Sequence, residues 1–193
     1  MLPNILTISR IALTPLFIIL LFSDKPYSKI YALLIFIIAA ITDAYDGHLA
    51  RKYNQVTIEG QFLDPLADKI LVLSSFISFA YLGVIEFWMV GLIAFRDIFV
   101  TGIRLAMNRN GISMETSHVA KLKTVFQITF IIITLIVLSL DSLTFNIAKS
   151  IVSLFYDYNL FYVLMIFVVG ISLYTGIHYL IKNKVQILRF LAN

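Results

Sequence analysis

Six long apolar segments dominate the sequence and limit what it can fold into. Set apart from charged and turn-forming stretches, they cover about residues 5–22, 29–51, 60–82, 87–108, 119–140 and 158–181. Each holds roughly the 17–25 residues that a helix needs to cross the hydrocarbon core of a bilayer. The sequence therefore predicts an all-α integral membrane protein, with residues 1–193 forming a single domain of six transmembrane helices.

The composition agrees with a membrane protein. Hydrophobic residues make up 60% of the 193 residues and charged residues only 13%, against about 25% charged residues in soluble domains. Mean hydropathy is +0.93. The chain has no cysteine, which excludes disulfides, thiolate catalysis and zinc–sulfur sites. The opening MLPNILTISR lacks a charged leader and a small-residue cleavage site, so we expect the first span to be retained.

Lysine and arginine predict the orientation in the membrane. If the two termini and the connections 52–59 and 108–118 share one side, that side gathers ten basic residues. These are Arg10, Arg51, Lys52, Arg104, Arg109, Lys121, Lys123, Lys182, Lys184 and Arg189. The opposite side keeps three, Lys25, Lys29 and Lys149. By the positive-inside rule, both termini should face the cytoplasm from the cell membrane.

Two further stretches are expected to lie along the membrane surface as short amphipathic helices. One is the connection 141–157, whose apolar residues are Ile147, Ile151, Val152, Leu154 and Phe155. The other is the C-terminal KNKVQILRFLAN.

Four aspartates stand in two pairs where the second and third apolar segments meet. Asp43 and Asp46 precede the short connection 52–59, and Asp64 and Asp68 follow it. With 3.6 residues per turn, each pair lies on one face of its helix, and the connection makes the two helices antiparallel neighbours. An ionised carboxylate costs roughly 2.5–3.5 kcal/mol at the centre of a membrane helix, which favours shared cations. Because hard oxygen ligands suit Mg²⁺ or Mn²⁺, the pattern predicts a site for divalent metal ions.

Two glycines and an arginine accompany the aspartates. Gly47 and Gly60 remove Cβ atoms where a flat base or a pyrophosphate could press against the backbone. An interior glycine costs a helix about 1 kcal/mol relative to alanine, which suggests a purpose for both. Arg51 can neutralise phosphate charge. The alternative is that the aspartates form only interhelical polar contacts, with Asp43 and Asp46 marking a helix end.

This stretch resembles the signature of the CDP-alcohol phosphatidyltransferase family. DAYDGHLAR, then eight residues, then GQFLDPLAD matches D-x-x-D-G-x-x-A-R-(x8)-G-x-x-x-D-x-x-x-D at every fixed position. The resemblance implies a six-helix enzyme with two divalent ions. Such an enzyme transfers a phosphatidyl group from a CDP-linked lipid to an alcohol and releases CMP. The resemblance also implies a homodimer.

The resemblance assigns roles residue by residue. The metal ligands would be Asp43, Asp46, Asp64 and Asp68. The residues lining the cytidine diphosphate of CDP-diacylglycerol would be Gly47, Ala50, Arg51 and Gly60. Asp68 would also be the general base. It is the deepest of the four aspartates, about 12 Å beyond Gly60 along the helix axis, which suits a group that takes a proton from an attacking hydroxyl.

Basic residues outside the signature point to the acceptor alcohol. Arg96 and Arg104 are about two turns apart in the fourth segment, so both can face one cavity. Lys121 and Lys123 begin the fifth segment near the same boundary. Arginine binds phosphate through paired hydrogen bonds, so these four residues predict an anion-binding pocket for a phosphate group of the acceptor. The alternatives are an ion-pair network of the arginines with Asp97, and lysines that merely flank the fifth span.

Two short motifs resemble those of the phosphatidylglycerophosphate synthases within the family. PNILTISR resembles their opening, and AKLKTVFQ resembles G-K-x-K-T-x-x-Q with alanine in place of the glycine. Further candidate site residues are therefore Asn4, Thr7, Arg10, Thr124 and Gln127. The first three could instead form an amphipathic entry helix. The implied reaction joins CDP-diacylglycerol and sn-glycerol 3-phosphate to give phosphatidylglycerol phosphate and CMP.

Rival functions stay open. Within the family, the acceptor could be inositol, an inositol phosphate, serine or phosphatidylglycerol. Outside it, the four acids could serve a divalent-cation transporter, although the sequence lacks the repeated halves and interrupted helices typical of transporters. No nucleic-acid partner is predicted. Lys69 directly follows Asp68 and can either pair with a carboxylate or extend toward the membrane surface.

Overall fold

Helices make up almost all of the described structure. The computed structural model describes residues 2–53, 58–110, 118–143 and 145–191, and the side chains within them except at 2–11, 43–53, 58–68, 108–109, 118–121, 189 and 191. The helices are α1 (Leu2–Leu21), α2 (Ser28–Tyr53), α3 (Ile58–Tyr81), α4 (Phe87–Arg109), α5 (His118–Leu140), α6 (Asn146–Asp157), α7 (Leu160–Lys182) and α8 (Lys184–Leu191). No strand occurs within these ranges, so the predicted all-α fold is confirmed.

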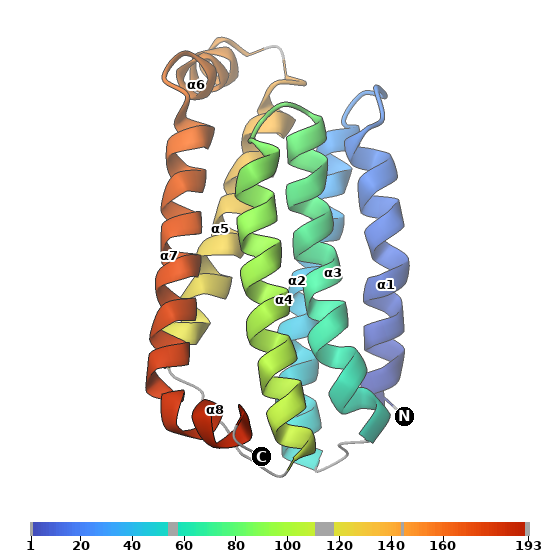
Figure 1. The fold of residues 1–193 in the computed structure, drawn as a ribbon. Helices are drawn as coiled ribbons and strands as arrows, with labels where there is room; N and C mark the ends of the chain where they lie inside the picture. Colours follow the sequence, from blue (N-terminus) through green and yellow to red (C-terminus); the bar gives the residue numbers. More distant parts are fainter. Residues whose placement is uncertain (1, 54–57, 111–117, 144, 192–193) are drawn as a thin grey trace.

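Six of the helices form a bundle along a common axis (Figure 1). They are α1 to α5 and α7, and their ends differ from those of the six apolar segments by at most three residues. In their described parts, Leu122–Leu140 and Leu160–Lys182 are long and apolar enough to cross a membrane. Shorter apolar stretches occupy Ala12–Leu21, Ser28–Thr42 and Lys69–Tyr81. The count of six spans stays a prediction.

The two short helices run crosswise at opposite ends of the bundle (Figure 1). α6 forms from the connection that was expected to be an amphipathic helix, and it buries Ala148 and Val152 while Ile147 and Leu154 stay exposed. α8 forms from the C-terminal stretch. Both stretches are therefore helical, as predicted.

A glycine turn joins α3 to α4. The N–H of Gly83 donates to the carbonyl of Ala80 at 3.1 Å, and that of Val84 donates to the carbonyl of Phe79 at 2.9 Å. This pair of bonds is a Schellman motif, which needs a left-handed residue just past the helix end. Gly83 supplies it with φ of +71°. The turn holds α3 and α4 as close antiparallel neighbours.

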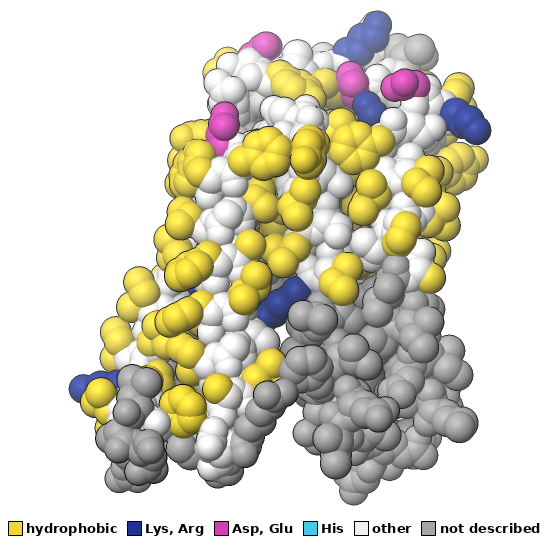
Figure 2. Space-filling view, turned by 45° about the vertical axis from the view of Figure 1, so that its right-hand side comes forward, with side chains coloured by type: hydrophobic (Ala, Val, Ile, Leu, Met, Phe, Trp, Pro, Cys, Tyr) yellow, Lys and Arg dark blue, Asp and Glu magenta, His cyan; other side chains and the backbone are white. Residues whose placement is uncertain are grey.

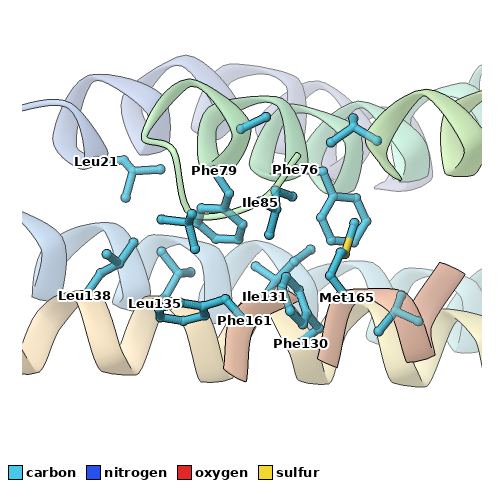
Figure 3. Packing of buried hydrophobic residues seen from close by; sticks show 14 of the residues in the cluster. Leu21, Phe76, Phe79, Ile85, Phe130, Ile131, Leu135, Leu138, Phe161 and Met165 are labelled. Atoms are coloured by element: carbon cyan, nitrogen blue, oxygen red, sulfur yellow. The ribbon is translucent and has the colours of Figure 1, made fainter. Parts of the chain in front are cut away.

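Apolar side chains fill the space between the bundle helices (Figure 3). Phe17 of α1 lies 5.9 Å from Phe36 of α2 between ring centroids, and Phe76 of α3 lies 6.1 Å from Phe130 of α5. α7 packs against both α4 and α5. Because protein interiors are close-packed, this core fixes α3, α4, α5 and α7 relative to one another. These four helices carry the polar cluster described below.

The outer surface of the bundle is largely apolar. Figure 2 shows hydrophobic side chains across the middle of one face, with most of the charged side chains in view gathered at one end. Large exposed hydrophobic residues occur on several helices, among them Ile19, Phe95, Ile98, Phe167 and Ile177. An exposed apolar surface of this extent is typical of a protein in contact with lipid.

Candidate functional site

The acidic signature lies at the helix ends on one side of the bundle. Asp43 and Asp46 belong to the last turns of α2, and Asp64 and Asp68 to the first turns of α3. Figure 1 shows these helix ends on the same side as the start of α1 and as α8. The side chains of the four aspartates lie outside the described part of the chain. The same is true of the predicted CDP-lining residues Gly47, Ala50, Arg51 and Gly60.

The donor set of the signature suits a hard divalent cation. Mg²⁺ and Mn²⁺ favour carboxylate oxygens, and the signature places four carboxylates within 26 residues. Among the side chains that the structure describes, no group of three or more His, Cys, Asp or Glu residues could hold a metal ion. The signature aspartates therefore remain the predicted ligands.

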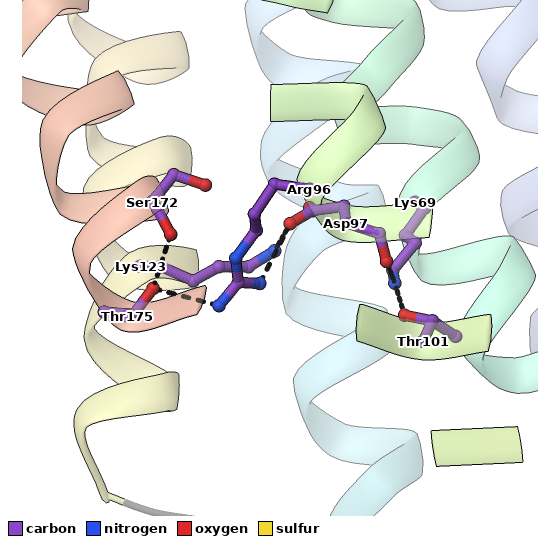
Figure 4. Close-up of polar contacts among 7 residues, drawn as sticks. All are labelled: Lys69, Arg96, Asp97, Thr101, Lys123, Ser172 and Thr175. Atoms are coloured by element: carbon purple, nitrogen blue, oxygen red, sulfur yellow. Dashed lines mark hydrogen bonds and ion pairs between the residues drawn. The ribbon is translucent and has the colours of Figure 1, made fainter. Parts of the chain in front are cut away.

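A buried polar cluster joins α3, α4 and α5 inside the bundle (Figure 4). At its centre is Asp97 of α4, whose side chain is 5% exposed. Its Oδ1 accepts a hydrogen bond from Arg96 Nη1 at 3.1 Å and pairs with Lys123 of α5. Lys69 of α3 donates to the backbone carbonyl of Asp97 at 3.0 Å and to the hydroxyl of Thr101. Three basic side chains thus converge on one short segment of α4.

Arg96 extends the cluster from α4 onto α7. Its Nη2 donates to Thr175 Oγ1 at 3.0 Å, and that hydroxyl donates to the carbonyl of Ser172 at 2.9 Å. The side chain passes against the backbone of Gly176, where a Cβ would stand 2.8 Å from Arg96 Nε. Arg96 Nε is buried and has no hydrogen-bond partner among the described residues.

Arg104 contacts the same helix further along the axis. Its Nε donates to the hydroxyl of Tyr179 at 3.2 Å, and its guanidinium carbon lies 5.3 Å from the centre of the Tyr179 ring. Tyr179 is 1% exposed. A hydrogen bond and a cation–π contact therefore fix this arginine against one buried ring.

The charges of the cluster do not cancel among the described side chains. Arg96 and Lys123 contribute two positive charges, and Asp97, which both of them contact, contributes one negative charge. Excess buried charge is costly unless it is paired. The pair of basic side chains is therefore suited to bind an anion.

The structure brings some of the predicted acceptor residues together. Arg96 and Lys123 meet at Asp97, which is the ion pairing that the sequence left as the alternative to a phosphate pocket. Gln127 is buried, and its Nε2 has no partner among the described residues, whereas Thr124 is exposed. The side chains of Asn4, Thr7, Arg10 and Lys121 lie outside the described part of the chain.

Five residues that contact the basic side chains or are among them were not predicted as site residues, namely Lys69, Thr101, Thr175, Gly176 and Tyr179. The position of Lys69 could have marked it as a site residue, since it directly follows the deepest aspartate. Nothing in the sequence indicated the three residues of α7, because they are more than 70 residues away from their contacts on α4.

The helical bundle, its apolar surface and its acidic signature define a membrane-associated helical protein. The sequence model described as CDP-alcohol phosphatidyltransferase matches residues 1–174. The chain belongs to the CDP-alcohol phosphatidyltransferase family, which confirms the resemblance.

Several curated relatives share one name, CDP-diacylglycerol–glycerol-3-phosphate 3-phosphatidyltransferase. The one from Bacillus subtilis (strain 168) is 39% identical over 139 residues, which cover 66% of this chain and 72% of the relative. The one from Rickettsia bellii (strain RML369-C) is 40% identical over 126 residues, covering 65% and 70%. The one from Cereibacter sphaeroides is 36% identical over 135 residues, covering 68% and 61%.

Proposed function

We propose that this chain transfers the phosphatidyl group of CDP-diacylglycerol to sn-glycerol 3-phosphate, giving phosphatidylglycerol phosphate and CMP. The observation that carries the proposal is the complete signature between Asp43 and Asp68. It occurs in a chain that is 39% and 40% identical to two relatives named for this reaction.

The bond changes of the proposed reaction are simple. A hydroxyl of glycerol 3-phosphate attacks the phosphorus atom that bears the diacylglycerol. The bond from that phosphorus to the bridging oxygen of the pyrophosphate breaks, and CMP leaves with the electron pair. Asp68 accepts the proton of the attacking hydroxyl. Because such a transfer depends mainly on positioning and charge neutralisation, the remaining residues act by binding and orienting the two substrates.

The signature residues would bind the donor. Asp43, Asp46, Asp64 and Asp68 would hold two divalent ions, Mg²⁺ or Mn²⁺, which neutralise the negative charge of the pyrophosphate when bound. Gly47, Ala50, Arg51 and Gly60 would line the cytidine diphosphate. The glycines suit this role because a backbone without Cβ atoms allows a close approach.

The buried cluster supports a phosphate-bearing acceptor. Arg96 and Lys123 outnumber the single carboxylate of Asp97, and a phosphate monoester carries about −1.5 to −2 near neutral pH. Lys69 directly follows Asp68 and contacts the carbonyl of Asp97, so the cluster lies beside the part of α3 that holds the proposed base. Arginine has five donor hydrogens and lysine three. Arg96 and Lys123 can therefore keep Asp97 and still donate to a phosphate, with Arg104 and Lys121 completing the pocket.

The proposed setting is the cell membrane. The chain would span it six times, with both termini and the signature facing the cytoplasm, and would act as a homodimer. The basic residues on that side support the orientation.

The test is release of CMP by the purified protein from CDP-diacylglycerol, with Mg²⁺ or Mn²⁺ and a panel of alcohols. We expect release with glycerol 3-phosphate and its loss on chelation of the metal. Asp68→Asn should still bind CDP-diacylglycerol but lose turnover, whereas the exposed Asp157→Asn serves as a matched control. Near-normal turnover of Asp68→Asn would remove the base assignment. Faster release with inositol or serine would change the acceptor, and no release with any alcohol would overturn the proposal.

A further inference from the structure

Three buried residues of α7 form a stripe against the two arginines of α4. The stripe consists of Thr175, Gly176 and Tyr179, which span about 6 Å along the helix axis. The match to the family model ends at residue 174, so the stripe begins just beyond it. None of the roles proposed above falls on these residues.

Gly176 and Thr175 together determine the path of Arg96. The guanidinium is held at two points, by Asp97 Oδ1 at 3.1 Å and by Thr175 Oγ1 at 3.0 Å. A Cβ at position 176 would stand 2.8 Å from Nε and 3.1 Å from Cγ, closer than van der Waals contact allows. Because both ends of the guanidinium are already bonded, the side chain cannot move away without breaking one of these bonds. Glycine is therefore the residue that permits this conformation.

Tyr179 likewise restricts the conformation of Arg104. Its hydroxyl accepts a hydrogen bond from Arg104 Nε, and its ring lies under the guanidinium. Since Tyr179 is buried, its ring has little freedom to move. A fixed ring restricts the conformations that the long arginine side chain can adopt.

We propose that the α7 stripe positions Arg96 and Arg104 for the phosphate of the acceptor. An arginine whose conformation is already fixed loses less side-chain freedom when it binds an anion, so it binds more tightly. Thr175 and Tyr179 each use one guanidinium hydrogen and leave others for the ligand. This inference rests on the proposed function, because it assigns the stripe to the same acceptor site. Its residues are positioning residues and need not touch the substrate.

The test compares Gly176→Ala and Tyr179→Phe with matched changes on the same helix. Gly170→Ala adds a Cβ where nothing lies within 4 Å, and Tyr174→Phe removes an exposed hydroxyl. For the two stripe variants we expect KM for glycerol 3-phosphate to rise about five- to tenfold, as the loss of a hydrogen bond to a charged group allows. Their KM for CDP-diacylglycerol should stay within about twofold of wild type. The two control variants should keep both constants.

A second measurement separates this inference from the proposed function. Inorganic phosphate should raise the thermal unfolding temperature of the wild type more than that of Gly176→Ala. If the wild type releases no CMP with glycerol 3-phosphate, the proposed function fails, and the phosphate comparison still tests the stripe. Equal rises in both KM values, or equal stabilisation by phosphate, would overturn the inference. If Gly176→Ala does not fold, Thr175→Val and Tyr179→Phe provide the same comparison.

Discussion

At the scale of single residues, Asp97 is the residue that joins the three basic side chains of the buried cluster. It is the one acid among the described side chains of the cluster, and it meets Arg96 and Lys123 with its carboxylate and Lys69 with its carbonyl. Breaking a buried ion pair by removing one partner costs about 3–5 kcal/mol, because the other charge is left without compensation. Asp97 therefore allows two cations to stay charged inside the bundle.

Asp97→Asn should lower the thermal unfolding temperature of the ligand-free protein. Asparagine keeps the shape of the side chain but loses the charge, so Arg96 and Lys123 are left facing each other. Phosphate can then supply the missing negative charge, and we expect it to stabilise the variant more than the wild type. The control is Asp141→Asn, because Asp141 is 53% exposed and pairs with Lys29 at 3.9 Å, an ion pair worth about 0–1 kcal/mol. Equal unfolding temperatures for Asp97→Asn and wild type would contradict this role.

At the scale of helices, the sequence predicted the elements well and their contacts poorly. Length and hydropathy located all six bundle helices, because an apolar run ends where charged and turn residues begin. The two crosswise helices were also expected from their amphipathic composition. The contact of Arg96 with Thr175 and Gly176 was not, because nothing local to α7 says which of its faces meets α4. For the same reason, the sequence did not predict the contact of Arg104 with Tyr179.

The α3–α4 turn gives a prediction at this scale. Gly83→Ala should destabilise the protein. The backbone at position 83 has a φ of +71°, in the left-handed region, and this conformation costs alanine roughly 1–2 kcal/mol. For a chain of this size, that corresponds to a drop in the thermal unfolding temperature of about 2–8 °C. Gly91→Ala, in α4 with open space around the added Cβ, should cause no drop. A loss of stability in both variants would attribute the effect to something other than the turn.

At the scale of the whole molecule, the two ends of the bundle differ in what they carry. One end holds the signature helix ends and α8, and the other holds α6 (Figure 1). The basic residues concentrate on the signature side, which predicts that this side faces the cytoplasm. A site on this side would take glycerol 3-phosphate from the cytoplasm and release CMP into it.

The absence of cysteine from the chain makes this orientation directly testable. Lys149→Cys on α6 and Lys184→Cys on α8 each introduce a single exposed thiol, at opposite ends of the bundle. In intact cells, a maleimide that cannot cross the membrane should label Lys149→Cys and leave Lys184→Cys unlabelled. After permeabilisation it should label both. Both variants should keep CMP release, because neither position belongs to the proposed site. Labelling of Lys184→Cys in intact cells would place the C-terminal helix outside and reverse the predicted topology, while labelling of both from outside would contradict an arrangement in which the bundle spans the membrane.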